Sequence, residues 1–227
     1  MIKVKICGIQ TLEAAVEADK NGADFIGFIF YRKSPRYIDP FKAAEIAKSV
    51  SCKKVGVFVD EEPLTVNGIS RLVNLDYVQL HGNEDAKYVG KIHRTPIIKA
   101  FPYNESFDVR EVNKFPCEIV LLDSFVKGRM GGTGKTFDWH KASTEIRKLT
   151  KPVLIAGGIS TQNILEVIDI FHPFGVDLSG SLEINGVKSV NKIREFLQRA
   201  KGNYAEQQQQ IQNQNQNIRN VLEEFLS

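Results

Sequence analysis

The stretch "PVLIAGGISTQNILEVIDIFHPFGVDLS" (residues 152–179) contains two short apolar runs with a segment of helical spacing between them. The runs, 152–157 and 175–179, are apolar nearly throughout, which is typical of parallel strands buried on both faces. Between them, apolar residues recur at the spacing of one helix face: Ile164, Leu165, Ile168 and Phe171. The stretch therefore predicts a strand, a helix and a second, parallel strand.

Six more apolar runs precede this stretch, at 2–7, 24–30, 54–59, 76–80, 96–101 and 118–123. The segments between them have room for one helix each, as the spacing of Leu12, Ala15, Val16 and Ala18 illustrates. Eight such units favour an α/β fold of the (β/α)8 TIM-barrel type over a doubly wound open sheet, which usually needs only about five or six strands. We expect a single catalytic domain over residues 1–201.

The composition limits the possible ligands and locations. Hydrophobic residues make up 42% and charged residues 25% of the 227 residues, and the net charge is +3 with basic residues scattered among acids. These values favour a small anionic ligand and argue against nucleic acid and membrane as partners. The longest apolar run, 25–31, is far shorter than the roughly 20 residues of a membrane span, and no signal peptide is evident, so we expect a cytoplasmic protein.

Two loops predict a phosphate site. In this barrel type, phosphate is commonly held after strands seven and eight. Gly157 and Gly158 follow strand seven, ahead of Ser160 as a helix cap, and Ser179, Gly180 and Ser181 follow strand eight. Each loop alone is more typical of a tight turn, but together they indicate backbone N–H groups arranged around a phosphate.

Two strand ends carry groups suited to proton transfer. Cys7 ends strand one and is either buried packing, as we expect for Cys52 and Cys117, or a base or nucleophile whose pKa falls from about 8.5 toward neutrality. Asp123 ends strand six and is either a loop cap or a partly desolvated general acid. Placed across the barrel mouth, the two side chains would act as base and acid on opposite sides of a substrate.

Two further polar residues lie at predicted strand ends. Arg36, between Pro35 and Tyr37, can offer its guanidinium to a carboxylate, whereas the neighbouring Arg32 and Lys33 are typical of a solvated turn. His81, in "QLHG", has no evident partner in the sequence and reads more readily as a polar rim residue than as a catalyst.

The segment "GRMGGTGKT" (128–136) resembles a nucleotide-binding P-loop but fails its spacing. The P-loop pattern requires its first glycine where Arg129 stands, and it follows a strand directly, whereas several residues separate Asp123 from these glycines. We interpret the segment as a mobile cover beside Asp123, with glycines as hinges.

Several motifs, in order along the chain, resemble the phosphoribosylanthranilate isomerases of tryptophan biosynthesis. They are "VKICGI", "KSPRYI", "VGVFV", "VQLHG", "LLDS" leading to "GGTGKTFDW", "AGGI" and "VDLSGSLE". The resemblance implies a barrel that performs a cofactor-free Amadori rearrangement, with no metal, on a small phosphorylated substrate. It assigns Asp123 as general acid, Cys7 as general base and Arg36 to the anthranilate carboxylate. We also expect His81 and Asp177 to bind the substrate. It places phosphate at the loops after strands seven and eight.

Two departures from the family pattern matter. The usual loop after strand eight reads Asp-Val-Ser-Ser-Gly-Val-Glu, whereas residues 177–183 have Ser and Gly exchanged at the fourth and fifth places. After Gly202 the resemblance stops, and ten of the eleven residues 207–217 are Gln or Asn. We interpret residues 202–227 as a low-complexity tail, flexible or forming a short amphipathic helix.

Two alternatives remain from the sequence. A related histidine-pathway phosphosugar isomerase would share the phosphate loops but uses two aspartates, whereas strand one here supplies Cys7. A non-catalytic barrel that binds ligands or serves assembly would have no need of both Cys7 and Asp123. The sequence leaves open whether the protein is a monomer or a homodimer.

Overall fold

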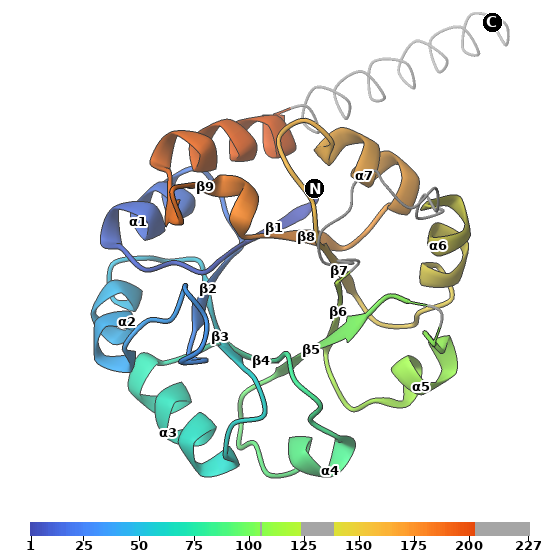
Figure 1. Cartoon of the computed structure of the whole chain (residues 1–227), viewed down its shortest axis with the longest axis horizontal. Helices are drawn as coiled ribbons and strands as arrows, with labels where there is room; N and C mark the ends of the chain where they lie inside the picture. The colour runs from blue at the N-terminus through green and yellow to red at the C-terminus, as the bar shows by residue number, and fades with distance from the viewer. Residues whose placement is uncertain (105, 124–138, 203–227) are drawn as a thin grey trace, which may run out of the picture.

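Eight parallel strands close into a barrel in chain order, as the sequence predicts (Figure 1). The structure, a computed structural model, describes residues 1–104, 106–123 and 139–202. The strands are β1 (Lys3–Cys7), β2 (Phe25–Ile29), β3 (Lys53–Phe58), β4 (Tyr77–Leu80), β5 (Ile97–Pro102), β6 (Ile119–Asp123), β7 (Val153–Ala156) and β8 (Gly175–Leu178). The open-sheet alternative is thereby excluded, because β1 pairs with both β2 and β8.

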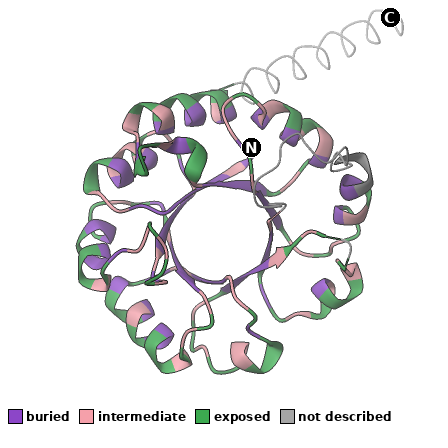
Figure 2. Ribbon diagram, viewed as in Figure 1, coloured by how far each residue is buried: buried purple, intermediate pink, exposed green. Residues whose placement is uncertain are grey.

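Helices surround the barrel and cover its outer surface. They are α1 (Leu12–Lys20), α2 (Pro40–Ala47), α3 (Pro63–Val73), α4 (Ala86–Val89), α5 (Val109–Lys114), α6 (Trp139–Ile146) and α7 (Ile164–Phe171), and a further helical segment covers 190–202. Figure 2 shows their buried faces turned toward the strands. The larger of two apolar clusters fills the space between strands and helices.

Local sequence fixes where several helices begin. Asp39 accepts hydrogen bonds from the N–H groups of Phe41 (2.9 Å) and Lys42 (3.3 Å), and Pro40 supplies the first helical turn of α2. The predicted cap of the helix after strand seven is wrong by three residues. Asn163, not Ser160, directly precedes α7. The carbonyl oxygen of Ser160 accepts hydrogen bonds from the N–H groups of Asn163 and Ile164, which form a turn ahead of the helix that begins at Ile164.

Strand register determines which side chains enter the barrel. The smaller apolar cluster fills its interior with Phe25, Val55, Ile98, Ala100, Ile119, Leu121, Leu154 and Ala156. Successive strand residues point to opposite faces, so Asp123, two residues after Leu121, takes the interior side. Cys7 takes the same side, since it lies opposite Gly27, two residues after Phe25. Both residues stand at the C-terminal ends of their strands.

Two predicted features lie outside the described residues. The cover loop at 128–136 belongs to the segment 124–138, and the Gln/Asn-rich tail lies outside them except for Gly202. Within the described ranges, none of the helices combines the length and apolar character that a membrane span requires.

Candidate active site

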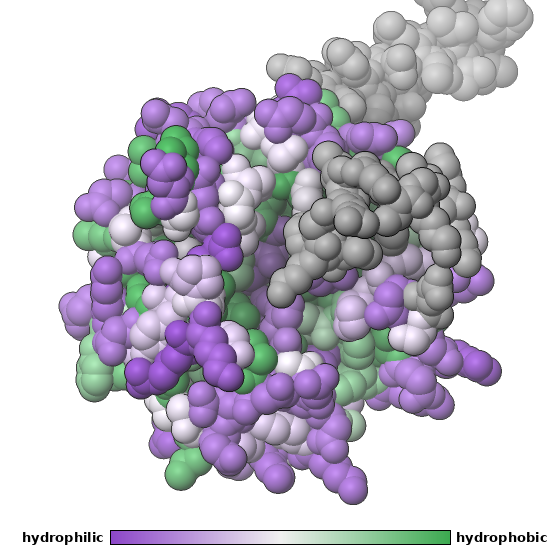
Figure 3. Space-filling model, in the orientation of Figure 1, coloured by the Kyte–Doolittle hydropathy of each residue, from purple (hydrophilic) through white to green (hydrophobic). Residues whose placement is uncertain are grey.

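The C-terminal ends of the strands form a hollow lined by polar groups. Figure 3 shows hydrophilic residues on the floor of this hollow, at the centre of the face. β1 contributes Cys7, β6 contributes Asp123 and β8 contributes Asp177, each fixed by strand pairing rather than by a loop. The parallel barrel therefore brings together three functional groups that the chain spreads from position 7 to position 177.

A buried ion pair lies beneath Cys7. Lys5 and Asp177 are register partners on β1 and β8, and Lys5 Nζ lies 3.0 Å from Asp177 Oδ1, with 0% and 9% of their side chains exposed. Burial alone would lower the pKa of Lys5, but the charges of Asp177 and Cys7 outweigh it and raise that pKa. Lys5 therefore stays charged. The sequence reading missed Lys5, although its position two residues before Cys7 in a buried strand puts both on one face.

Cys7 is a buried thiol next to cations. A side chain at position 27 would meet Cys7 Sγ at 2.9 Å and Lys5 Nζ at 3.1 Å, so Gly27 leaves the space in which these two atoms approach each other. Burial and the charge of Asp177 raise the pKa of Cys7 above its ordinary value, although the charges of Lys5 and Lys188 act in the opposite direction. The fall of this pKa toward neutrality that the sequence led us to expect is therefore not seen in the free protein. Charged groups therefore lie close to this buried thiol.

His81 has partners that the sequence did not reveal. Its Nε2 lies 3.5 Å from Asp123 Oδ2, and its Nδ1 lies 2.9 Å from Gln79 Nε2. With the amide nitrogen of Gln79 donating to Nδ1, the neutral imidazole carries its proton on Nε2, on the side of Asp123. The expectation that His81 has no partner is wrong, because Gln79 on β4 and Asp123 on β6 both lie beside its ring.

Gln79 is almost fully buried inside the barrel, with 1% of its surface exposed. Within the described part of the chain, its Oε1 has no hydrogen-bond partner. Its amide group therefore stays in the interior to contact His81, at the cost of leaving one acceptor unsatisfied.

Arg36 meets a carboxylate of its own chain. Its Nε donates to Glu183 Oε1 at 2.6 Å and its Nη2 donates to Glu183 Oε2 at 2.8 Å, in the two-point geometry expected of this pair. Glu183 begins a small hairpin, β9 (Glu183–Ile184) and β10 (Val187–Lys188), which follows β8. Lys188 Nζ also donates to Glu183 and lies 3.4 Å from Ser179 Oγ. Glu183 and Lys188 were not predicted as site residues.

This arrangement lowers the pKa of Glu183. Burial would raise its pKa, but hydrogen bonds from Arg36 and Lys188 lower the pKa from 4.5 to about 2. A depressed pKa stabilises the folded state above pH 4.5, and this contribution is lost as the pH falls from 4.5 toward 2.

We expect wild-type protein to lose up to about 3 kcal/mol of unfolding free energy from this group across that window. In Glu183→Gln this component should be missing, so the loss between pH 5 and pH 3 should be smaller, although the variant is less stable at pH 7. Urea unfolding at both pH values measures the difference. The other acids titrate in both proteins, so equal losses would contradict the assignment.

The two predicted phosphate loops lie next to each other because β7 pairs with β8. Gly157 and Gly158 have φ angles of +89° and +67°, which glycine adopts without strain. After β8, Ser179 leads into the 3-10 turn η1 (Gly180–Leu182), which includes Ser181. A side chain at position 180 would come within 3.4 Å of Arg36 Nη2. The turn after β8 therefore lies near Arg36, and the loop after β7 follows the neighbouring strand.

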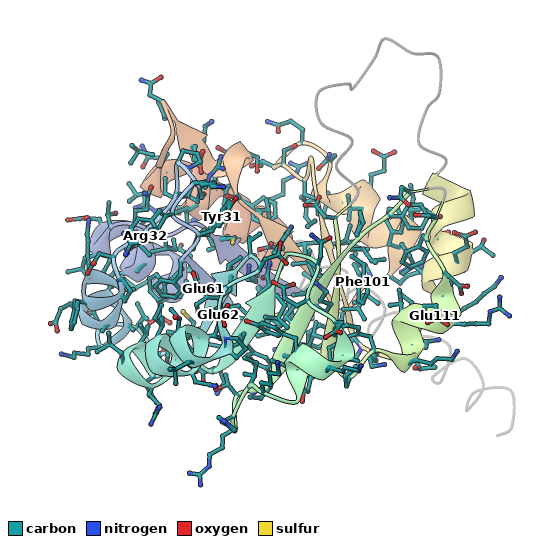
Figure 4. All side chains as sticks on the ribbon, turned by 60° about the horizontal axis from the view of Figure 1, so that its bottom comes forward. Tyr31, Arg32, Glu61, Glu62, Phe101 and Glu111 are labelled. Atoms are coloured by element: carbon teal, nitrogen blue, oxygen red, sulfur yellow. The ribbon has the colours of Figure 1, made fainter. Side chains whose placement is uncertain are left out.

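The remaining predicted residues lie apart from this chemistry. Arg32 sits 5.4 Å from the ring centre of Tyr37, and Figure 4 shows it beside Tyr31, on the opposite side of the barrel from Phe101. Cys52 and Cys117 are buried and free, and burial raises their pKa values to about 12 and about 11. They are packing residues, as the sequence predicts.

The geometry suits proton transfer on a small anion. Burial raises the pKa of Asp177, and this carboxyl group is close enough to Lys5, His81 and Asp123 for each of them to affect that pKa. Across residues 1–104, 106–123 and 139–202, the structure shows no cluster of three or more His, Cys, Asp or Glu that could hold a metal. A thiol and a carboxyl at one barrel mouth, with a guanidinium beside them, are groups that can act as a base, an acid and an anion-binding group.

Comparisons with known proteins agree with this description. Residues 4–199 match the family model described as N-(5'phosphoribosyl)anthranilate (PRA) isomerase. The chain is 42% identical over 205 residues to the N-(5'-phosphoribosyl)anthranilate isomerase of Geotalea uraniireducens, covering 89% of this chain and 100% of that protein.

Two crystal structures are similar over 89% of this chain and all of theirs. One contains monomers generated from a dimeric phosphoribosylanthranilate isomerase of Thermotoga maritima, with 36% identity and a TM-score of 0.77. The other is a phosphoribosyl anthranilate isomerase in complex with reduced 1-(o-carboxyphenylamino)-1-deoxyribulose 5-phosphate, with 35% identity and a TM-score of 0.77.

Proposed function

Because the chain belongs to the N-(5'-phosphoribosyl)anthranilate isomerase family, we propose that its barrel mouth performs this isomerisation with Cys7 as base and Asp123 as acid. The reaction converts N-(5-phosphoribosyl)anthranilate into 1-(2-carboxyphenylamino)-1-deoxyribulose 5-phosphate, a step of tryptophan biosynthesis. The observation that carries the assignment of roles is the common interior face on which β1 and β6 present a thiol and a carboxyl group.

The first step opens the furanose ring. Asp123 donates its proton to the ring oxygen, the C1–O bond breaks, and the nitrogen lone pair forms a Schiff base at C1. His81 Nε2, 3.5 Å from Asp123 Oδ2, supports the carboxylate that remains after proton transfer. Proton donation at neutral pH requires a protonated carboxyl group, so the substrate-bound site must favour the neutral form of Asp123.

The second step forms the product skeleton. The Cys7 thiolate removes the proton from C2, and the electron pair of that C–H bond forms the C1–C2 double bond of an enolamine while the C=N electrons return to nitrogen. Tautomerisation then gives the ketone. Substrate and product are isomers, so the sequence of proton transfers balances without a redox partner.

The rest of the mouth holds the substrate. Arg36 shares its guanidinium between Glu183, which takes Nε and Nη2, and the anthranilate carboxylate. The amides after β7 and β8, at Gly157, Gly158 and the 179–181 turn, bind the phosphate. Asp177 and His81, which lie close enough to each other and to Asp123 to interact electrostatically, contact the sugar.

The alternatives are less well supported. The histidine-pathway isomerase requires a second aspartate where this chain has Cys7, and the family match covers residues 4–199 as one unit. A non-catalytic barrel gives no reason for a thiol and a carboxyl group on the same interior face.

A fluorescence assay tests the function directly. Purified protein should accelerate the loss of phosphoribosylanthranilate fluorescence under conditions where the substrate is otherwise stable, without added metal or cofactor. The aminoimidazole ribotide of the histidine pathway serves as the comparison substrate. A fluorescence decay equal to that of the buffer control would contradict the proposed function. Faster turnover of the histidine-pathway substrate would assign the protein to that reaction instead.

The setting of the enzyme is a further part of the proposal. Three free cysteines fit a reducing compartment, which supports the cytoplasm. Gel filtration with light scattering would distinguish a monomer from the dimeric state described for the Thermotoga maritima enzyme.

A further inference from the structure

The Cys7 thiolate needs positive charge nearby, whereas the phosphate of the substrate brings negative charge to the same site. A thiolate at Cys7 forms in a buried site, near loops that hold a phosphate dianion. The charged groups facing Cys7 are Lys5 and Asp177 from inside the barrel, and Lys188 and Arg36 from the rim, with Glu183 bound to both rim cations. The question is which of them offsets the negative charge.

The inner pair is electrically neutral, whereas the outer group is not. Lys5 and Asp177 are bonded one to one at 3.0 Å, so the charge of the Lys5 ammonium is largely balanced. At the rim, Arg36 and Lys188 share the single carboxylate of Glu183, and two cations with one anion leave a net charge of +1. The rim group therefore adds a net positive charge to the effect of Lys5, which lowers the pKa of the thiol more than Lys188 does.

Lys188 is held at the rim, next to the residue that follows Cys7, by several contacts. It is buried, with only 2% of its side chain exposed, and its ammonium contacts Glu183 and, at 3.4 Å, Ser179 Oγ. A side chain added at Gly8, the residue after Cys7, would meet Lys188 Nζ at 3.3 Å and Arg36 Cδ at 2.8 Å. The backbone glycine at φ +80° thus allows the rim cations to approach β1.

We propose that Lys188 is a positioning residue of the reaction, whose ammonium stabilises the Cys7 thiolate and whose bond to Glu183 fixes the carboxylate that orients Arg36. This inference rests on the proposed function of Cys7 as base. One side chain on β10 thereby links the base on β1, the phosphate loop after β8 and the guanidinium after β2. The mutual effects on the two pKa values support this link. Lys188 lowers the pKa of the Cys7 thiol, and Cys7 raises the pKa of Lys188, which burial lowers.

The test replaces Lys188 by methionine and compares Lys192→Met as the matched control. Lys192 Nζ donates to the carbonyl of Glu183 at 2.8 Å, so it supports the same hairpin through the backbone rather than through the carboxylate. In Lys188→Met, Glu183 keeps both hydrogen bonds from Arg36 and is not left unpaired. Lys188→Gln is a second variant that keeps hydrogen-bonding capacity while removing the charge.

The main readout is the pH titration of the Cys7 thiolate in free enzyme, followed by ultraviolet absorbance with Cys7→Ala as the blank. We expect both neutral variants to move the midpoint upward, so that the thiolate fraction and kcat at pH 7.5 fall about tenfold. The deficit in kcat should shrink as the pH rises, because the thiol ionises and the wild-type Lys188 loses its own charge. Lys188→Arg should recover most of the difference, and Lys192→Met should titrate like wild type.

The outcomes separate this inference from the proposed function. An unchanged thiolate midpoint in folded Lys188→Met and Lys188→Gln would overturn it, even if their rates fell, because that result means a structural role only. If the Lys188 variants shift the thiolate midpoint but the wild-type protein does not consume phosphoribosylanthranilate, the electrostatic link holds and the proposed function is refuted.

Discussion

Cys7→Ala is expected to lower kcat for phosphoribosylanthranilate by about a thousandfold, the scale at which a positioned general base contributes. Alanine leaves the C2 proton of the Schiff base without an acceptor, while the ring-opening acid and the substrate-binding groups remain. The affinity for the product analogue should change little, because Cys7 lies on the strand below the anion-binding loops. The measurement is the initial rate from substrate fluorescence, together with a product titration by calorimetry.

Cys117→Ala is the matched control for this variant. Cys117 is buried to the same degree as Cys7, at 7% and 6% exposure, but it precedes β6 at the opposite end of the barrel. Its removal should cost some stability and leave kcat near the wild-type value. A Cys7→Ala enzyme with a near-wild-type rate would remove Cys7 from the mechanism.

Asp123→Asn is expected to reduce kcat by a similar factor, about a thousandfold, because a carboxamide cannot donate a proton to the furanose oxygen at neutral pH. The variant keeps the size of the side chain and its place beside His81, so binding of product should persist. The loss should fall on kcat, because the missing interaction forms only as the C1–O bond breaks. Steady-state kinetics over a range of substrate concentrations separates kcat from KM.

Asp76→Asn provides the corresponding control. Asp76 precedes β4 at the N-terminal end of the barrel, where it accepts from Lys54 N at 2.9 Å and pairs with Lys53 at 2.8 Å. Neutralising it removes an acid from the same barrel without touching the mouth, so turnover should be retained. If Asp123→Asn lost its activity through KM alone, Asp123 would be a binding group and the general acid would have to be sought elsewhere.

The eight strands were predictable because burial on both faces leaves a clear signal. Runs such as 118–123 and 152–157 lack the alternation of half-exposed strands, and β6 and β7 occupy Ile119–Asp123 and Val153–Ala156. The positions of Cys7 and Asp123 followed, since the rule that barrel sites lie at C-terminal strand ends needs only strand boundaries.

The charged partners could not be read from the sequence in the same way. Lys5 stands 172 residues from Asp177, and Arg36 stands 147 residues from Glu183, so no local sequence pattern predicts either pair. Only Lys5 carried a usable signal, its two-residue spacing from Cys7. His81 appeared isolated because Asp123 belongs to a different strand and Gln79, two residues earlier, was read as part of a strand core.

The sequence by itself determined the barrel, its strand order and the residues that stand at its mouth, because apolar periodicity and turn residues act over short distances along the chain. Only the tertiary structure decided which charges neighbour Cys7. Closure of β1 against β8 places Lys5 beside Asp177, and the hairpin after β8 places Lys188 and Glu183 beside Arg36. Ionisation in a buried site depends on distance in space, and the distances between these groups are set when the barrel closes.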